Sequence, residues 1–565
     1  MTSKGIYLQW EGKRPYKQRI PSPRLLEPVN SLSTNLNSEN LVIEGNNLQV
    51  LASLRGRYAG AVDVIYIDPP YNRGGNDFRY SDKRYQDPDA DGSDGIYVTN
   101  EDGGKHTKWL NTMAPVMKLL WEMLHPENGV FFASINDREL FHLGLLLDEV
   151  FDEKNRIGVL VWKGATDNNP TRIAVEHEYI LCYARNADKL ARRWRDQDNE
   201  AKAFMLDGYR NLKSENRSLA MLKKAYAAFA KEHRQYIGDL YRYRHLDEHG
   251  PFVSRRNLDK PDQHGYRYKV QHPVTKKYCP VPPGGWRYPE YRFKELQEQG
   301  RIIFGKDEKK LPQLKVYLEE VEFPLRSVIL GIDSRAGANE LLKLTGDRYE
   351  LRYPKPVELI KKLLAYTTRR DSLVLDAFAG SGTTAQAVME LNHRDKGSRR
   401  FILIEEGEPD DRYCRTLTAK RVRAAIDEYG FSDGFTFFTT GRKLDRKAII
   451  GFERDALANL ICQSDETGRG RGITRLSSFK FIIGKNSRNE AICLLWNGSG
   501  KSEVTKDHLR AAADEVSAAQ LKRPFRIYGT SCRYSNTTSW RFCQIPDEIL
   551  LQLQLDEEPS EIDDE

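Results

Sequence analysis

The sequence predicts an α/β protein built on a doubly wound, mostly parallel sheet. Two apolar, β-branched segments, 61–67 and 372–375, are each followed by a polar loop, as expected for strands buried on both faces of a parallel sheet. Apolar residues recur at helical spacing in 109–124 and 140–150, between further strand-like segments. This alternation favours a parallel sheet covered by helices on both faces.

Each expected element has a local signal. The turn Pro126–Gly129 separates an amphipathic helix from an apolar strand, and Asn136 or Asp137 is suited to cap the helix that follows. Pro356 is tolerated in the first turn of a later helix. In order, we expect strand 41–43, helix 47–54, strand 61–67, helix 109–124, strand 130–135, a helix through 140–150, strands 157–162 and 179–183, a helix from 356 through 364, strand 372–375, a helix through 385–389, and strands 400–404 and 435–438.

The segment Asp68-Pro69-Pro70-Tyr71 follows the strand 61–67 directly. Open α/β sheets bind ligands at the carboxyl ends of their strands. The two prolines hold the chain extended, so a carboxylate, a bare carbonyl and an aromatic ring stand together in a stiff loop. Asp68 and the Pro69 carbonyl can accept hydrogen bonds from an amine, and Tyr71 offers a face for a flat ring. The alternative is an ordinary proline turn with Tyr71 in the packing.

A second loop follows the strand 372–375 and opens a helix. Its glycines, Gly380 and Gly382, allow a ligand to approach the backbone at a helix amino end. With Ala385 they also satisfy the G-x-G-x-x-A pattern of dinucleotide-binding proteins, so a nicotinamide or flavin oxidoreductase is a competing interpretation. Glu405, at the end of the next strand, is suited to hold ribose hydroxyls in either class.

Together the two loops resemble the S-adenosylmethionine-dependent amino-methyltransferases of DNA, with the catalytic motif before the cofactor motif. The segments Leu8–Lys13, Ile43–Leu48, His177–Leu181 and Tyr353–Pro356 extend the likeness to the modification (Mod) subunits of type III restriction-modification systems. The resemblance implies methyl transfer from S-adenosylmethionine to adenine N6 of a base flipped out of double-stranded DNA. Cytosine N4 as the target, or a specificity subunit that serves a partner nuclease, remain alternatives.

The resemblance also assigns site residues. The catalytic set is Asp68, Pro69, Pro70 and Tyr71, and the cofactor set is Asp376, Phe378, Ala379, Gly380, Ser381, Gly382, Glu405 and Lys355, with Glu408 as a second candidate acid. No metal is required for this chemistry, and none is predicted. A helicase-nuclease restriction subunit and a second copy of the chain are the expected protein partners.

From residue 192 to 318, basic and aromatic residues are interleaved. Arg and Lys can neutralise phosphates, and exposed rings can stack on an unpaired base. A solvated surface with rings packed beneath it is the alternative, but the resembled family keeps its target-recognition domain between the two catalytic halves. We therefore expect a DNA-binding insertion that uses Arg242, Arg244, Arg255, Arg256 and Trp286. The segment 72–108 lacks periodicity and is either a functional loop or a disordered insertion.

These signals divide the chain into an arm (1–40), a catalytic half (41–188), a target-recognition domain (189–325), a cofactor half (326–445) and a small α/β unit with an acidic tail (446–565). In the last unit we expect strands 479–483, 492–496 and 525–528 and helix 506–520. The net charge of +7 is consistent with a polyanionic partner. The seven scattered cysteines indicate neither disulfides nor zinc, and no apolar run suits a membrane span, so a cytoplasmic protein is expected.

Overall fold

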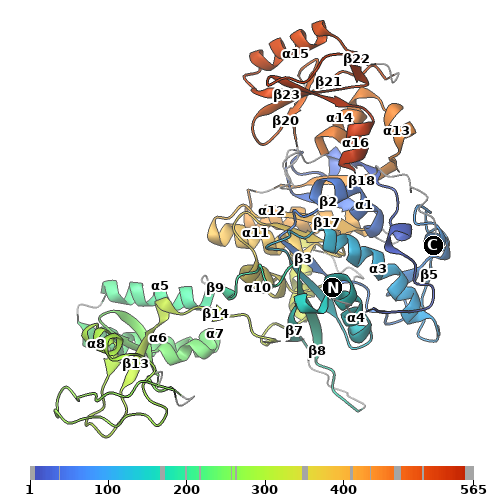
Figure 1. Ribbon diagram of the computed structural model, residues 1–565. Helices are drawn as coiled ribbons and strands as arrows, with labels where there is room; N and C mark the ends of the chain where they lie inside the picture. Colours follow the sequence, from blue (N-terminus) through green and yellow to red (C-terminus); the bar gives the residue numbers. More distant parts are fainter. Residues whose placement is uncertain are drawn as a thin grey trace. The chain divides into compact units, whose positions relative to one another are not determined.

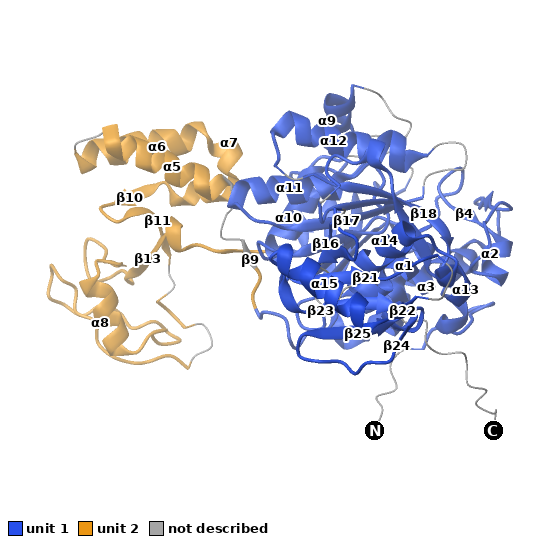
Figure 2. Cartoon of the chain, turned by 90° about the horizontal axis from the view of Figure 1, so that it is seen from above, with its two compact units in different colours: residues 1–192, 326–565 blue, residues 193–325 orange. Residues whose placement is uncertain are grey.

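A computed structural model shows that the chain forms two compact units (Figure 2). Unit 1 comprises residues 1–192 and 326–565, and unit 2 comprises residues 193–325. The residues described are 7–36, 38–165, 172–196, 200–215, 218–255, 258–260, 264–346, 354–406, 412–432, 434–463, 473–476, 478–498 and 502–553.

A ten-stranded sheet forms the centre of unit 1, and it confirms the predicted α/β class. Its order is β1 (Arg24–Pro28), β18 (Thr436–Lys443), β2 (Leu41–Glu44), β17 (Arg400–Glu405), β16 (Leu373–Asp376), β3 (Val64–Ile67), β6 (Val130–Ile135), β8 (His177–Ala184), β7 (Arg156–Lys163) and β15 (Val328–Ile329). Neighbouring strands from β18 to β6 run parallel, and so do β7 and β15.

The antiparallel members of the sheet depart from the expected parallel pattern. β8 runs antiparallel to both β6 and β7, since no helical pattern between residues 163 and 177 returns the chain for a parallel crossover. At the opposite edge, β1 pairs antiparallel with β18 and lies in the segment predicted as an irregular arm. Its prolines and lack of periodicity concealed a strand that uses only one edge for pairing.

Helices cover both faces of the sheet (Figure 1). One face carries α1 (Asn47–Tyr58), α3 (Lys105–Met123) and α4 (Leu140–Phe151), and the other carries α10 (Val357–Thr367), α11 (Thr383–Asp395) and α12 (Ala419–Tyr429), with α9 (Arg335–Thr345) packed on α12. α1 is longer than expected. α3 begins inside the segment predicted as a loop, and α4 begins after Glu139 rather than after Asn136 or Asp137.

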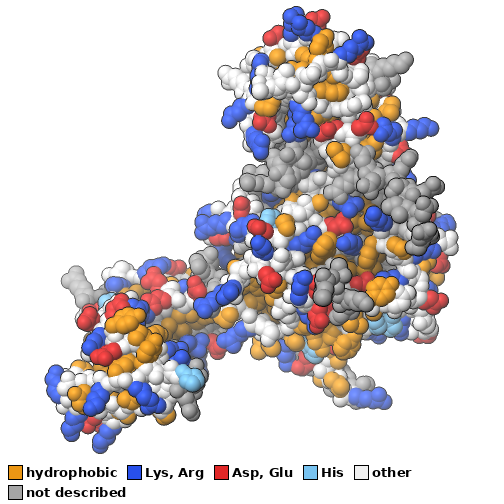
Figure 3. Space-filling view, viewed as in Figure 1, with side chains coloured by type: hydrophobic (Ala, Val, Ile, Leu, Met, Phe, Trp, Pro, Cys, Tyr) orange, Lys and Arg blue, Asp and Glu red, His pale blue; other side chains and the backbone are white. Residues whose placement is uncertain are grey.

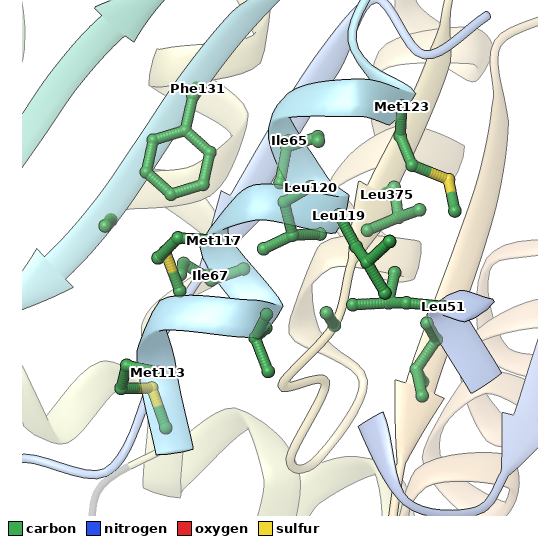
Figure 4. Packing of buried hydrophobic residues seen from close by; sticks show 14 of the residues in the cluster. Leu51, Ile65, Ile67, Met113, Met117, Leu119, Leu120, Met123, Phe131 and Leu375 are labelled. Carbon is green, nitrogen blue, oxygen red and sulfur yellow. The ribbon is translucent and has the colours of Figure 1, made fainter. Parts of the chain in front are cut away.

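The core between the sheet and α3 explains why β3 is apolar throughout. Ile65 and Ile67 point toward α3 and meet Met117 and Leu120, and all four side chains are inaccessible to solvent (Figure 4). Burial of an aliphatic side chain of this size contributes about 1.5–3 kcal/mol. Because successive side chains of a strand alternate, Val64 and Tyr66 face the other layer and are also buried. β3 is therefore held from both sides.

The strand order creates a crevice at the carboxyl ends of β3 and β16. From β3 the chain continues through α3 to β6 on one side, whereas from β16 it continues through α11 to β17 on the other. Such a reversal of direction between two adjacent parallel strands is where open α/β sheets bind their ligands. Both loops singled out in the sequence begin at this point.

Residues 72–104 are ordered rather than a disordered insertion. They contain β4 (Arg79–Tyr80), α2 (Asp82–Gln86) and β5 (Ile96–Tyr97), with β4 and β5 paired antiparallel. Phe78, Tyr80 and Val98 are buried in the same core as α3. These apolar anchors are isolated in the sequence, so they give no periodic signal.

Unit 2 has two small cores. Helices α5 (Glu200–Glu215), α6 (Leu219–Glu232) and α7 (Arg234–Ile237) pack beside a sheet of order β10 (His245–Asp247), β11 (Gly250–Arg255), β13 (Gln313–Tyr317) and β12 (Ile302–Ile303). The second core lies around Trp286 and α8 (Glu290–Glu298). The chain enters and leaves unit 2 through the antiparallel pair β9 (Arg195–Asp196) and β14 (Phe323–Pro324).

The carboxyl-terminal part of unit 1 forms a second, smaller sheet. Its order is β19 (Thr474–Arg475), β20 (Ile482–Lys485), β21 (Glu490–Leu494), β23 (Lys522–Gly529) and β25 (Trp540–Gln544), with β22 (Glu503–Val504) and β24 (Ser531–Cys532) paired separately. Its helices are α13 (Arg446–Ile450), α14 (Arg454–Gln463), α15 (Lys506–Ala518) and α16 (Asp547–Gln552). Within the described part of the chain, no helix is long and apolar enough to cross a membrane.

Two helical glycines provide a matched test of the packing. A Cβ at Gly337 of α9 would clash with the Pro354 carbonyl oxygen, whereas a Cβ at Gly144 of α4 would meet nothing within 4 Å among the described residues. We expect Gly337→Ala to lower the free energy of unfolding by about 1–3 kcal/mol, the usual cost of overpacking. Gly144→Ala should raise it by up to about 1 kcal/mol through helix propensity. Urea denaturation measures both, and equal effects would contradict the close contact at Gly337.

Candidate active site

A side chain of α3 holds the Asp68–Tyr71 loop in place. Trp109, fully buried on this helix, donates a hydrogen bond from Nε1 to the Pro70 carbonyl oxygen at 2.8 Å. Because Pro69 and Pro70 have no backbone N–H, this carbonyl contact is a main means of holding the loop. The loop therefore leaves β3 in a defined direction, with Asp68 at the crevice.

Asp68 belongs to a group of four interacting side chains, with Tyr71, Glu178 and Lys355. The Tyr71 hydroxyl donates to Asp68 Oδ1 at 2.8 Å, with Glu178 Oε2 at 3.1 Å as a second acceptor. Lys355 Nζ lies 2.9 Å from Asp68 Oδ2, 3.1 Å from Glu178 Oε2 and 3.0 Å from the Tyr71 hydroxyl oxygen. Glu178 reaches this edge because β8 is antiparallel, so that its first residues lie beside the carboxyl end of β6. Residues from three distant segments thus form one network.

Lys355 is the buried cation of this network. Burial alone would lower the pKa of its ammonium group, but the carboxylates of Asp68 and Glu178 raise it, and the net shift is upward. Burial and the same two carboxylates also raise the pKa of Tyr71 well above its usual range. Lys355 therefore stays charged and Tyr71 stays protonated, so that both act as hydrogen-bond donors to the carboxylates.

The ring of Tyr71 is not open to a stacking partner in this state. Its side chain is only 4% exposed, and the Arg73 guanidinium lies 4.6 Å from the ring centroid and Lys355 Nζ 5.0 Å from it. This is the face that the sequence predicts to receive a flat ligand ring. A ligand that stacks there has to displace a cation that now covers the face.

The second loop begins with a buried carboxylate. Asp376, the last residue of β16, accepts hydrogen bonds from Thr384 Oγ1 at 2.6 Å and from the Phe378 backbone N–H at 3.0 Å. Burial raises the pKa of Asp376 to about 7, and the negative charges of Asp68 and Glu405 act in the same direction. A positively charged ligand beside Asp376 would offset this cost and favour the ionised form.

The backbone amides of the glycine loop are largely engaged within the protein. Gly380 N–H donates to Glu405 Oε2 at 2.6 Å, Ala379 N–H to the Ile404 carbonyl at 3.1 Å, and Gly382 N–H to the Ala379 carbonyl at 2.8 Å. Gly380 and Gly382 adopt positive φ angles of 50° and 85°, which glycine tolerates best. A dinucleotide site would instead direct such amides toward an anionic pyrophosphate.

Arg421, which was not among the predicted site residues, holds the side chains of this loop. It is fully buried on α12, and its NH1 donates to Ser381 Oγ at 2.6 Å and to Thr383 Oγ1 at 2.7 Å. Burial lowers the pKa of Arg421 to about 10. Glu178, Arg73 and Trp109 were also missed as site residues. Glu178 belongs to the segment 177–181, which carries part of the family resemblance. An acidic residue at the end of a predicted strand was the sequence signal that could have identified it.

The crevice is therefore rich in carboxylates. Asp68, Glu178, Asp376 and Glu405 line the loops at the strand ends, and Lys355 is the cation buried among them. This donor set can accept hydrogen bonds from an amine and attract a cationic ligand, and it opposes a pyrophosphate. The predicted catalytic and cofactor residues that the structure describes belong to these two loops, to β17 or to the Lys355 segment. Glu408, the second candidate acid, and Tyr353 lie outside the described residues.

The residues predicted to bind DNA separate into two groups. Arg242 is exposed, and Arg244 and Arg255 are half-buried, with Arg244 over the Tyr241 ring and Arg255 NH2 3.3 Å from the Tyr243 hydroxyl. Trp286 is 1% exposed and packs on Tyr268 and Phe293, so the prediction that it contacts DNA is wrong. Its aromatic-basic neighbourhood could not distinguish a core ring from a surface ring. Arg256 lies outside the described residues.

Comparison with known proteins agrees with this geometry. A model of the DNA methylase family (N6_N4_Mtase) matches residues 62–419, which include both loops and all of unit 2. The chain belongs to the DNA methylase family. The family match thus starts at the strand before Asp68 and ends at the start of the helix that carries Arg421.

Curated relatives of this chain include two Mod subunits. The type III restriction-modification enzyme EcoP15I Mod subunit of Escherichia coli is 36% identical over 425 residues, which cover 72% of this chain and 66% of that protein. The StyLTI Mod subunit of Salmonella typhimurium is 33% identical over 386 residues, covering 66% of this chain and 53% of that protein. The chain therefore spans roughly half to two thirds of the length of these relatives.

Among solved structures, the chain is similar to PvuII DNA methyltransferase, described as cytosine-N4-specific. The TM-score is 0.32 and the sequence identity 11%, with coverage of 70% of this chain and 93% of that one.

The buried lysine offers a test of the network. We expect Lys355→Met to lower the free energy of unfolding by about 3 kcal/mol, the lower end for breaking a buried ion pair, because Asp68 and Glu178 side chains remain a quarter exposed. Adding Glu178→Gln should recover part of the loss, since it removes one of the two unpaired charges. Urea denaturation measures this cycle, with exposed Lys447→Met as the control. Losses that simply add would contradict a shared network.

Proposed function

We propose that the chain is a DNA methyltransferase that transfers a methyl group from S-adenosylmethionine to the exocyclic amine of a base flipped out of double-stranded DNA. The observation that carries this proposal is the meeting of two loops at one crevice. Asp68 directly follows β3, Asp376 is the last residue of β16, and these two strands are parallel neighbours. A carboxylate that can accept hydrogen bonds from an amine thus lies beside a loop suited to a cationic cofactor.

The residues proposed to hold the cofactor are those of the second loop, with Asp376, Glu405 and the backbone of Phe378–Gly382 as the main contacts. S-adenosylmethionine supplies a methyl group on a positively charged sulfur. Asp376, whose pKa is raised to about 7, and Glu405 suit a ligand that carries positive charge. Phe378 is half-buried at the loop and provides an apolar surface for a ring.

Asp68 and the Pro69 carbonyl are proposed to accept hydrogen bonds from the target amine. The Lys355 ammonium now lies 2.9 Å from Asp68 Oδ2, which supports the ability of this carboxylate to hold an N–H donor from that direction. Fixing the amine in this way orients its nitrogen toward the methyl group, and orientation supplies much of the rate. Asp68 or Glu178 can take the proton that the nitrogen loses, with Tyr71 hydrogen-bonded to both.

We propose adenine N6 as the target, with cytosine N4 as the alternative. The support is an aspartate, rather than a serine, at position 68, which the family resemblance associates with adenine. For Tyr71 to stack on the base, the Arg73 guanidinium has to move from the ring face. Arg73 also lies 3.7 Å from Glu178 Oε1, so this carboxylate can hold it after it moves.

Unit 2 is proposed as the target-recognition domain. It lies between the two loops in the sequence and forms a separate compact body, and on the visible face it carries Lys and Arg side chains mixed with acidic ones (Figure 3). Arg242, Arg244 and Arg255 remain the proposed DNA contacts. The names of the Mod relatives support a further proposal, that the chain acts with a restriction subunit in a restriction-modification system. A second copy of the chain stays a proposed partner, on the family resemblance alone.

The direct test of this function is methyl transfer to DNA. Purified full-length chain is incubated with double-stranded DNA and labelled S-adenosylmethionine, and the digested nucleosides are identified by mass spectrometry. We expect N6-methyladenine from the wild type and from Asp371→Asn, an exposed carboxylate before β16. Asp68→Asn should lower the rate by about 10²–10⁴-fold, the range for a positioned acid-base group. A rate close to wild type in Asp68→Asn would exclude the catalytic assignment.

DNA recognition is tested by charge reversal in unit 2. We expect the triple variant Arg242→Glu, Arg244→Glu, Arg255→Glu to weaken DNA binding and to flatten its salt dependence, since each lost phosphate contact lowers the slope by about one. The matched control reverses Lys506 and Arg510 of α15 and Lys522 of β23, three exposed cations of the carboxyl-terminal part of unit 1. If both variants bind DNA with the wild-type affinity and slope, unit 2 is not the recognition surface.

A further inference from the structure

Two histidines and a glutamate form a cluster beside the Asp68–Tyr71 loop. His106 lies in the first turn of α3, Glu139 is the residue before α4, and His142 lies in the first turn of α4. Their nitrogen and carboxylate oxygen atoms all lie within 4.8 Å of one another. In the part of the chain that the structure describes, this is the cluster of such residues able to hold a metal ion.

Glu139 is a buried charge with few partners. Its side chain is 0% exposed, and Oε1 accepts from Asn72 Nδ2 at 2.6 Å and lies 2.7 Å from His106 Nδ1. Oε2 lies 2.9 Å from His142 Nδ1, yet neither of these two atoms makes a hydrogen bond to the residues that the structure describes. A buried carboxylate is costly unless it is paired or coordinates a metal. Among the described residues, the basic side chains recorded within ion-pair distance of it are these two histidines.

The donor set identifies the class of ion. The two imidazole rings lie 4.5 Å apart between centroids and both direct Nδ1 toward the same carboxylate. Two nitrogens and a carboxylate suit Zn²⁺ and neighbouring transition metals, whereas Mg²⁺ and Ca²⁺ prefer sites made of oxygen alone. We propose that His106, Glu139 and His142 bind a divalent transition-metal ion, with Zn²⁺ as the representative, and that this ion braces the Asp68–Tyr71 loop.

Access to the site and its surroundings fit such an ion. The His106 and His142 side chains are 40% and 39% exposed, so an ion can enter from solvent, and three protein ligands leave a position for water. Asn72, which is buried and donates to Glu139, supplies the outer contact that orients a metal-binding carboxylate. The buried, unpaired Glu139 Oε2 is then satisfied by the ion.

The same residues connect the ion to the loop. Asn72 directly follows Tyr71, has a positive φ of 58°, and donates also to the Lys105 carbonyl at 3.2 Å. His106 stands three residues before Trp109, one helical turn away, and Trp109 holds the Pro70 carbonyl. An ion bound to His106 and Glu139 therefore ties the ends of α3 and α4 to both sides of the loop. Metal binding at this cluster and its effect on loop order do not depend on the proposed methyl transfer.

Metal binding is tested on the full-length chain after chelator treatment. Co²⁺ is titrated while its visible absorption is followed, and Zn²⁺ is then used to displace it. The variants are His106→Gln and His142→Gln, with exposed His393→Gln of α11 as the matched control. We expect the wild type and the control to bind one more tight equivalent than either variant, with loss of affinity in the variants of at least about 100-fold, the upper range for removing an outer contact.

The brace is tested by hydrogen exchange of the same proteins. Zn²⁺ should slow amide exchange in residues 71–80 and raise Tm in the wild type and in His393→Gln, and it should do neither in His142→Gln. Equal Co²⁺ stoichiometry and spectra in the wild type and both ligand variants would overturn the site. Tight binding to the wild type without slower exchange in the loop would overturn the bracing role.

Discussion

The parallel pairing of β3 with β16 is the constraint on which the rest of the structure depends. The two strands are far apart in the sequence, yet Val64 lies opposite Val374 and Ile65 opposite Leu375. The pairing is secured at its start by Asp63, which accepts from the Leu373 backbone N–H at 3.0 Å and from Arg369 at 2.8 Å, across 310 residues in the first case. Because both strands then run in the same direction, their carboxyl ends, and the two loops, open at one edge.

The crevice concentrates negative charge, and this explains several of its other features. Burial, together with carboxylates from four segments, raises the pKa of Asp376 and keeps Tyr71 protonated, and the same carboxylates keep the buried Lys355 charged. The cost is offset partly by Lys355 and would be offset further by a cationic ligand. The same charge disfavours a pyrophosphate, which separates the site from a dinucleotide fold with a similar glycine pattern.

How much could be predicted from the sequence depended on the range of each signal. The strand before Asp68 and the glycine loop were recognisable because each is a short, continuous pattern. Glu178 was not, since its place in the site follows from the antiparallel direction of β8. Trp286 was assigned to the surface because composition does not show which rings are buried. The histidine–glutamate cluster joins residues 33 positions apart, and only its Glu-x-x-His spacing at the start of α4 was a local signal.

We propose that the two loops form a site for a cationic, methyl-donating cofactor rather than for a dinucleotide. Calorimetric titration of the full-length chain with S-adenosylmethionine and, separately, with NAD tests this claim most directly. We predict that one equivalent of S-adenosylmethionine binds per chain and that NAD produces no binding heat, because the amides of the glycine loop are engaged and the crevice is acidic. Binding of NAD without binding of S-adenosylmethionine would contradict the account.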